Sequence, residues 1–216
     1  MNLHKYPRTL HLPWSEHVTT DDKKLPTINV FENKEVVVTE KLDGENSSMY
    51  NGHYHARSLN SRNHPSRNFV KGIHGSIEHA IPDGWRVCGE NVYAKHSIHY
   101  SRLSSYFYVF GTYDENNTCL SWDETVDFCN SINLEVAPTL YRGLWDEKEV
   151  MNCYTGESVF GGKQEGYVVR LANSFPYDEF SDSVAKMVRK DHVQTSKFWM
   201  NEQIIVNGLQ LGQNEV

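Results

Sequence analysis

The chain of 216 residues is 38% hydrophobic and 23% charged, an ordinary composition for a globular protein with one buried core. Its formal net charge of −7 argues against tight, unspecific binding to nucleic acid, which needs a basic field, but not against a local basic groove. The apolar runs are too short to cross a membrane, and the N-terminus lacks the apolar core of a signal peptide. We therefore expect a single cytoplasmic domain spanning residues 1–216.

The first third of the chain predicts a leader, a strand, a hairpin and a helix. Prolines scattered through residues 1–27 indicate an irregular leader that packs across the domain surface. The β-branched run "EVVVTEKL" at 35–42 is typical of a buried strand. Residues 47–58 predict a hairpin around Asn51-Gly52, and the apolar spacing within 66–80 predicts a helix.

The remaining segments alternate irregularly between strands and helices. Strands are expected at 85–94, 106–114, 135–142, 165–172 and 183–191. A capping box of Ser121 and Glu124 opens a helix over 121–132, a short helix follows at 145–154, and a last helix over 196–209 closes at Gly208. Because no regular βαβ order is present, the class is α+β with mainly antiparallel sheets.

Several residue types invite functional readings that the sequence does not favour. The cysteines lack a CxxC pair and are expected to be free, mostly buried thiols; they are Cys88, Cys119, Cys129 and Cys153. His96 and His99 lie three apart, but no further ligands follow at recognisable spacing, so no zinc site is expected. Trp14, Trp85 and Trp199 are able to stack on bases, but packing in the core is the commoner role.

Basic residues gather in two stretches despite the acidic total. The first holds Arg57, Arg62, Arg67 and Lys71, and the second holds Lys186, Arg189, Lys190 and Lys197. Charged residues also fall within apolar strand-like runs, where they cost free energy unless they are paired or functional; they are Lys41, Arg57, Glu90, Glu165 and Lys186. If these side chains share one groove, the cations suit phosphates and the carboxylates suit a ribose or a metal ion. The alternative is that each is an ordinary residue on an exposed strand face.

The order of these motifs resembles that of the covalent nucleotidyltransferases, the superfamily of DNA ligases, RNA ligases and mRNA capping enzymes. "Lys41-Leu-Asp-Gly44" resembles the KxDG element and "GluGlyTyrValValArg" at 165–170 the fourth motif of RNA ligases. Further similar elements follow in family order: "AlaArgSer" at 56–58, "CysGlyGluAsn" at 88–91, "PheTyrValPhe" at 107–110 and "AlaLysMet" at 185–187. The resemblance covers residues 40–190, about 70% of the chain, and fits the RNA-ligase branch best. The stretches "RTLHLPWS" and "HVQTSKFW" also resemble small bacterial and phage RNA ligases, which is compatible with a phage-encoded protein.

The resemblance implies an ATP-grasp-like ligase adenylation domain, with antiparallel sheets flanked by helices and the nucleotide in the groove between the sheets. It implies that the Lys41 amine attacks the α-phosphate of ATP, that pyrophosphate leaves, and that lysyl-AMP passes its AMP to an RNA 5′-phosphate before a 3′-hydroxyl seals the break. Mg²⁺ or Mn²⁺ would assist, held by Glu165. The implied roles of the other residues are these: Asp43 orients the lysine, Lys186 contacts the α-phosphate, Glu90 holds the ribose, Glu40 lies near the adenine, Phe110 stacks on it, and Arg57 contacts the nucleotide.

Free lysine has a pKa of about 10.4, so we expect a nucleophilic Lys41 to need a lowered pKa, from burial or from cations such as Lys186, Arg57 and bound metal. Gly44 is expected to permit a tight turn beside the nucleotide.

Some assignments remain open at this level. The second cation of the last motif is Arg189 or Lys190, and Arg57 is preferred to Arg62. Only 26 residues follow Lys190, too few for the second domain that ligases and capping enzymes usually append, so a minimal, single-domain ligase is expected. The alternatives are a GTP-dependent capping-type enzyme and a non-catalytic module that binds nucleic-acid ends.

Overall fold

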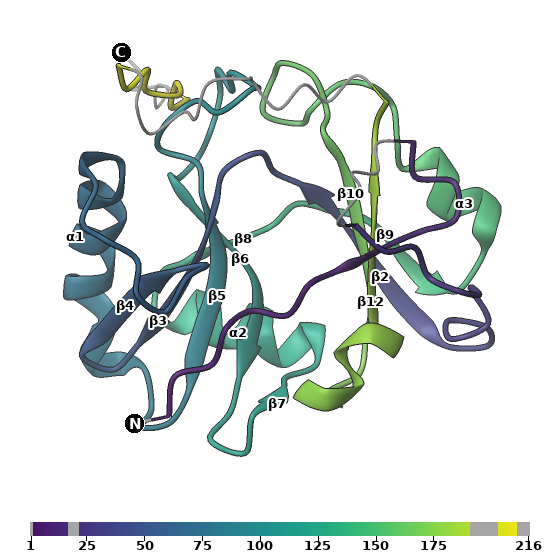
Figure 1. The fold of residues 1–216 in the computed structure, drawn as a ribbon, viewed down its shortest axis with the longest axis horizontal. Helices are drawn as coiled ribbons and strands as arrows, with labels where there is room; N and C mark the ends of the chain where they lie inside the picture. The colour runs from purple at the N-terminus through teal and green to yellow at the C-terminus, as the bar shows by residue number, and fades with distance from the viewer. Residues whose placement is uncertain (1, 17–21, 191–202, 211–216) are drawn as a thin grey trace, which may run out of the picture.

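Two β-sheets stand side by side in the computed structural model, which describes residues 2–16, 22–190 and 203–210 (Figure 1). The strands are β1 (Leu10–His11), β2 (Glu35–Lys41), β3 (Glu45–Tyr50), β4 (His53–Ala56), β5 (Arg86–Asn91), β6 (Phe107–Tyr113), β7 (Thr118–Cys119), β8 (Glu135–Val136), β9 (Thr139–Leu144), β10 (Gly166–Leu171), β11 (Phe175–Pro176) and β12 (Val184–Val188). The α-helices are α1 (Asn68–Ile77), α2 (Trp122–Ser131) and α3 (Glu147–Asn152), and short 3-10 turns lie at Pro65–Arg67, Glu78–Ala80 and Tyr177–Asp182. The expected α+β class with mainly antiparallel sheets is confirmed.

The first sheet has the strand order β1-β12-β10-β2-β9. Because successive side chains point to opposite faces, one face of the sheet packs in the core and the other lines the site. Val36 and Val38 of β2 point to the face that α3 covers and share a buried cluster with Val150 of that helix. Lys41 has the opposite orientation, because side chains one residue apart on a strand point to opposite faces. The β10 register places Gly166 opposite Lys41 and Val168 opposite Lys186.

The second sheet has the order β11-β7-β6-β5-β3-β4, with β8 added in parallel to β6. Helices α1 and α2 cover its outer face, where Val70 and Cys129 join Met49 and Val87 in one buried cluster. The predicted capping box opens α2, since Ser121 Oγ accepts from the Glu124 N–H and the Glu124 carboxylate accepts from the Ser121 N–H. The other face of this sheet is therefore not covered by these helices and points towards the first sheet.

The expected strand over 135–142 is wrong in its continuity. Residues 135–136 form β8 in the second sheet, whereas 139–144 form β9 beside β2 in the first sheet. The chain crosses between the sheets at Ala137-Pro138, where proline has no N–H to donate to a ladder. The Pro138 carbonyl instead accepts from the Glu40 N–H at 2.8 Å, so this crossing also supports the strand end that carries Lys41.

The expected helix over 196–209 is wrong for the residues that the structure describes, 203–210. This segment is extended and forms single bridges, Val206 with Ala94 and Leu209 with Leu103. The buried Asn207 side chain donates to the Val92 carbonyl at 2.8 Å and accepts from the Tyr100 N–H at 2.9 Å. The backbone of this segment also bonds to distant residues and not within a helix: the Asn207 N–H donates to the Tyr93 carbonyl at 3.0 Å and the Gly208 N–H to the Tyr100 carbonyl at 2.8 Å. Residues 196–202 of the expected helix, with Lys197 and Trp199, lie outside the described residues, as does the whole of the stretch "HVQTSKFW" at 192–199.

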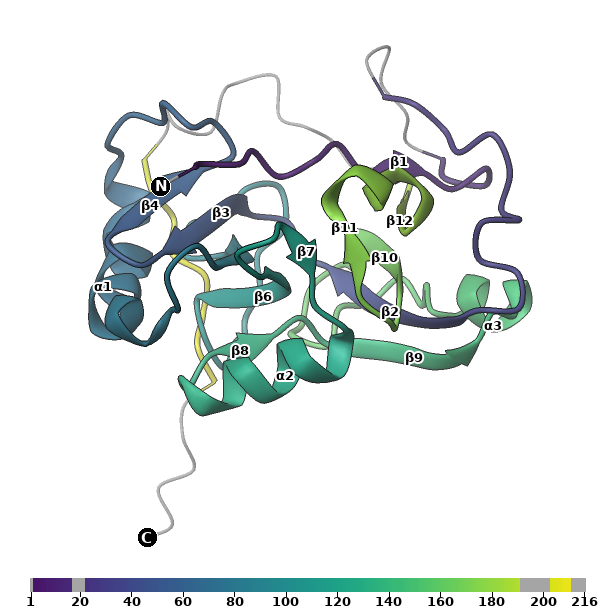
Figure 2. The same cartoon turned by 90° about the horizontal axis from the view of Figure 1, so that it is seen from below.

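The leader is more ordered than its prolines suggest. Residues 10–11 form β1, which pairs in parallel with β12 at the edge of the first sheet. From there the chain runs towards the N-terminus across the gap between the sheets, as Figure 2 shows from below. Its far end is attached to the second sheet through the His4 N–H, which donates to the Tyr50 hydroxyl at 3.0 Å. The leader therefore bridges both sheets.

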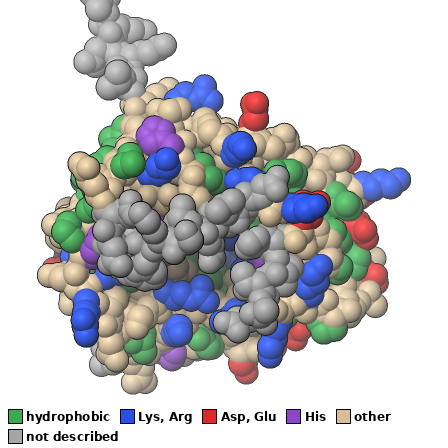
Figure 3. Space-filling model, turned by 45° about the horizontal axis from the view of Figure 1, so that its top comes forward, with side chains coloured by type: hydrophobic (Ala, Val, Ile, Leu, Met, Phe, Trp, Pro, Cys, Tyr) green, Lys and Arg blue, Asp and Glu red, His purple; other side chains and the backbone are tan. Residues whose placement is uncertain are grey.

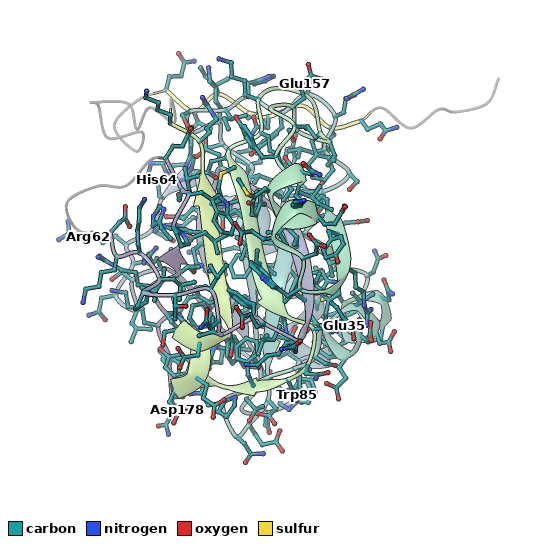
Figure 4. All side chains as sticks on the ribbon, turned by 90° about the vertical axis from the view of Figure 1, so that its right-hand side faces the viewer. Glu35, Arg62, His64, Trp85, Glu157 and Asp178 are labelled. Atoms are coloured by element: carbon teal, nitrogen blue, oxygen red, sulfur yellow. The ribbon has the colours of Figure 1, made fainter. Side chains whose placement is uncertain are left out.

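Other expectations concern buried side chains. All cysteines are free and buried, as expected. Trp14 donates to the Tyr167 hydroxyl at 2.8 Å, and Trp85 packs on Phe128 with ring centroids 5.3 Å apart, at the opposite end of the molecule from Glu157 in Figure 4. Both tryptophans are therefore held by other side chains. Among the described residues no helix has the length and apolar character needed to span a membrane.

Candidate active site

The inner faces of the two sheets enclose a cavity of about 1000 Å³. Nearly all the residues singled out in the sequence line it: Glu40, Lys41, Asp43, Arg57, Glu90, Phe110, Glu165 and Lys186. They come from both sheets, which explains why residues so distant in the sequence meet. One face of the molecule, shown in Figure 3, carries many Lys and Arg side chains, with Asp and Glu mostly near the margin of the view.

Lys41 lies at the end of β2 with its amine directed at Glu165. Its Nζ donates to both carboxylate oxygens of Glu165, each at 2.7 Å. The pairing of β10 with β2 explains this contact, because Gly166 is opposite Lys41 and Glu165 precedes it. About a quarter of the lysine side chain, 24%, remains exposed to the cavity, so the amine is both held and accessible.

The expectation of a lowered Lys41 pKa is not met in this state of the protein. Burial by itself lowers the pKa of Lys41, but the carboxylates of Glu165, Glu90 and Asp43 together raise it above its ordinary value. The amine is therefore a stable ammonium here. Its conversion to a nucleophile requires that ligands first neutralise or draw away the surrounding carboxylates.

The two glutamates near Lys41 also have raised pKa values. Burial raises the pKa of Glu165 to about 7 and that of Glu90 to about 8, in each case against the opposing effect of Lys41. Such carboxylates cluster in functional sites, where one of them is protonated unless a cation arrives. A cation that enters the cavity would therefore stabilise the ionised form of these carboxyl groups.

Replacing Glu90 by glutamine should stabilise the protein at pH 8. A carboxyl whose folded-state pKa lies above its unfolded value lowers the free energy of unfolding as pH rises between those two values, here from about 4.5 to about 8. A shift of this size corresponds to about 5 kcal/mol at most, and we expect wild type to lose part of that over this window and Glu90→Gln to lose less. Thermal unfolding at several pH values without nucleotide measures this, and parallel curves for the two proteins would contradict it.

Lys186 lies in the middle of β12, on the same face as Lys41. Burial is the main cause that lowers its pKa, and Lys41 and Arg57 act in the same direction. Its Nζ lies 3.7 Å from Asp22 Oδ1. Three cations thus converge on one part of the cavity, which is the arrangement that a phosphate requires.

Part of the cavity lining is suited to a flat apolar group. Phe110 and Val168 belong to one cluster and come from different sheets. The buried Glu40, which also lines the cavity, accepts from the Val159 N–H at 3.1 Å through Oε2, while its Oε1 has no hydrogen-bond partner among the described residues. Burial raises the pKa of Glu40. An aromatic face beside a hydrogen-bond acceptor can bind a purine that carries an amino group.

Asp43 and Gly44 form the turn after Lys41. Asp43 Oδ2 accepts from the N–H groups of Ser97 and Ile98 at 2.8 and 2.7 Å and from the Ser97 hydroxyl at 2.6 Å. A Cβ on Gly44 would lie 2.4 Å from the carbonyl oxygen of Asn91, so the glycine is needed for close approach to β5. This differs from the expected reason, which was a tight turn beside a ligand.

Three basic residues of the sequence clusters lie elsewhere. Arg189 is not among the cavity-lining residues, and its N–H donates to the Glu165 carbonyl at 3.0 Å. Arg67 is buried in an ion pair with Glu45, donating from Nε to Oε2 at 2.7 Å. Arg62 lies near His64 at one edge of the molecule (Figure 4), whereas Arg57 lines the cavity. The structure therefore brings Arg57, and not Arg62, to the site.

The sequence reading missed the contribution of the leader. The cavity is also lined by Lys5, Tyr6, Arg8, His11 and Asp22. Tyr6 packs edge-on against Phe110, with ring centroids 4.9 Å apart. Two signals were available, the polar and aromatic content of this segment and the resemblance of "RTLHLPWS" at 8–15 to small RNA ligases. Neither says where an irregular chain packs.

The donor set of the cavity includes carboxylate oxygens, which Mg²⁺ and Mn²⁺ prefer. Within the described residues no group of three or more potential ligands is preformed. This fits a metal ion that is bound by one or two carboxylates and completed by water and substrate phosphates. Glu165 and Glu90 are the residues able to take part.

Comparison with known proteins agrees with this architecture. The RNA ligase family model matches residues 34–188. The Naegleria gruberi RNA ligase with pyrophosphate superimposes with a TM-score of 0.57 at 18% identity, covering 87% of this chain and 61% of the other. An archaeal ATP-dependent RNA ligase gives 0.54 at 16% identity, covering 87% and 48%. A search of proteins with curated functions returns no match.

The fold and the paired sheets around a lysine define a nucleotidyltransferase-type domain. With its family match over more than half of its length, the chain belongs to the RNA ligase family. It spans 61% of the length of the Naegleria ligase, so the likeness describes the shared domain.

Proposed function

We propose that this protein is an ATP-dependent RNA ligase that joins 5′-phosphate and 3′-hydroxyl ends through a lysyl-AMP intermediate. The observation that carries the proposal is the Lys41 amine, held at 2.7 Å by Glu165 inside a cavity that Lys186 and Arg57 also line. An amine in one cavity with cations that can bind a phosphate is what nucleotidyl transfer requires.

The first step begins with proton loss from Lys41. Glu165 is the adjacent base, and burial gives it the raised pKa that suits this role. The Nζ–Pα bond then forms as the bond from Pα to the bridging oxygen breaks, and pyrophosphate leaves with the electron pair. Lys186 neutralises charge on the α-phosphate, and Glu90 accepts from a ribose hydroxyl.

A divalent cation would supply charge neutralisation for the phosphates and for the carboxylates around Lys41. Structures of Naegleria ligase variants with ATP or AMP and manganese support the use of ATP and a divalent metal here. Neutralisation of the carboxylates around Lys41 would lower the pKa of Lys41, which is the activation that the free protein lacks.

Two further steps complete the sealing. The 5′-phosphate of RNA attacks Pα, the N–Pα bond breaks, and AMP caps the 5′ end. The 3′-hydroxyl of the other strand then attacks the 5′-phosphorus, and AMP leaves as the new phosphodiester forms.

Incubation with [α-³²P]ATP or [α-³²P]GTP, a divalent metal and then RNA of defined ends tests the whole proposal. A labelled protein band from ATP, followed by transfer of label to RNA and a longer sealed product, is the expected result. Label from GTP alone would instead favour a capping-type enzyme. Binding of RNA ends without label from either nucleotide would favour an end-binding module.

Glu40→Ala should reduce the preference for ATP over GTP by about tenfold or more. The unpartnered Oε1 of Glu40 can accept from the amino group of adenine, whereas the same position of guanine presents an oxygen that the carboxylate repels. Initial rates of labelling with each nucleotide measure the ratio. An unchanged ratio would show that the base is read elsewhere.

A further inference from the structure

The leader brings a buried histidine into the cavity. His11 is 1% exposed, ends β1, and lies opposite Lys186 in the pairing of β1 with β12. This position, N-terminal to the motif that contains Lys41, puts an imidazole beside the cations of the site. The strand is held there by the Leu12 N–H, which donates to the Lys186 carbonyl at 2.7 Å.

The surroundings of His11 define which ring nitrogen carries the proton. Nδ1 lies 2.7 Å from Ser15 Oγ, which also accepts from the Val188 N–H at 2.9 Å. The Ser15 hydroxyl can donate either to Nδ1 or to the Val188 carbonyl, which lies 3.4 Å away. The Asp22 carboxylate 3.5 Å from Nε2 is what favours the tautomer with its proton on Nε2.

The Asp22 oxygen marks the position of an anion. Oδ1 lies 3.5 Å from His11 Nε2 and 3.7 Å from Lys186 Nζ, so two donors from neighbouring strands converge on one oxygen. Both distances exceed those of good hydrogen bonds, and Nε2 makes no such bond among the described residues. A buried N–H of this kind is satisfied when a better acceptor enters the cavity.

We propose that His11 is a further binding residue for the nucleotide, and that its Nε2–H donates to a non-bridging oxygen of the α-phosphate beside Lys186. This rests on the proposed function, which places that phosphate next to Lys41. Burial and the nearby Lys186 lower the pKa of His11 to about 4, so the ring contributes a neutral hydrogen bond at pH 7. The leader then contributes a binding residue to the site in addition to packing against the sheets.

Two substitutions separate this role from structural support. In His11→Asn the amide reaches the position of Nδ1 and can keep the contact with Ser15, whereas in His11→Gln it reaches the position of Nε2. We expect His11→Asn to weaken AMP binding by about tenfold, to leave adenosine binding within twofold, and to leave the melting temperature nearly unchanged. His11→Gln should recover most of the AMP affinity.

Calorimetric titration of the full chain with AMP and with adenosine, beside labelling by [α-³²P]ATP, gives the result. Equal loss of AMP and adenosine binding in His11→Asn, or wild-type AMP affinity in both variants, would overturn the inference. If wild type is labelled by ATP in that case, the proposed function stands alone. If wild type is not labelled but AMP binding still depends on His11, the phosphate contact stands and the ligase function falls.

Discussion

Replacing Lys41 by alanine should abolish covalent labelling by [α-³²P]ATP, with a fall of at least about a thousandfold. Alanine has no nucleophile, and the transfer of AMP to protein cannot begin without an N–P bond. The loss also leaves the Glu165 carboxylate without the amine that now donates to both of its oxygens. A denaturing gel after incubation with nucleotide and metal measures the label.

Lys41→Arg is the matched control, because it keeps a cation beside Glu165 while its guanidinium stays protonated. It should fold as wild type and remain unlabelled. Label in either variant at a level near wild type would place the nucleophile on another lysine, and Lys186 would be the next to test.

Gly166→Ala should destabilise the protein by about 3 kcal/mol or more and remove labelling at the same time. A Cβ at this position would lie 1.9 Å from the Met187 carbonyl oxygen, within the ladder between β10 and β12. Moving those strands apart would shift Glu165 away from Lys41, since Gly166 pairs with both Lys41 and Val188. Urea unfolding curves give the change in the free energy of unfolding.

Gly75→Ala provides the comparison for that experiment. Gly75 is an exposed position of α1, and nothing lies within 4 Å of a Cβ there. Alanine should raise the free energy of unfolding by up to about 1 kcal/mol, because it is the better helix former. A similar response of both glycines would mean that the predicted clash at Gly166 is absorbed by a small movement.

Local signals in the sequence were sufficient for most elements of the fold. The β-branched run at 35–42, the Asn51-Gly52 turn and the capping box at Ser121 each depend on neighbours within a few residues, and each is present in the structure. The break at Ala137-Pro138 and the extended path of 203–210 were not predicted. Both result from pairing with distant strands or loops, which no short window contains.

The sequence by itself determined the class of site: a lysine, paired carboxylates and further cations, in an order that resembles nucleotidyltransferases. Tertiary structure decided which residues meet, because pairing between strands distant in the chain brings Glu165 to Lys41 and leaves Arg189 outside the cavity lining. It also decided the charge state, since three carboxylates around one amine outweigh the effect of its burial. The leader was placed over the site for the same reason: backbone pairing of β1 with β12 depends on the edge that the folded sheet offers.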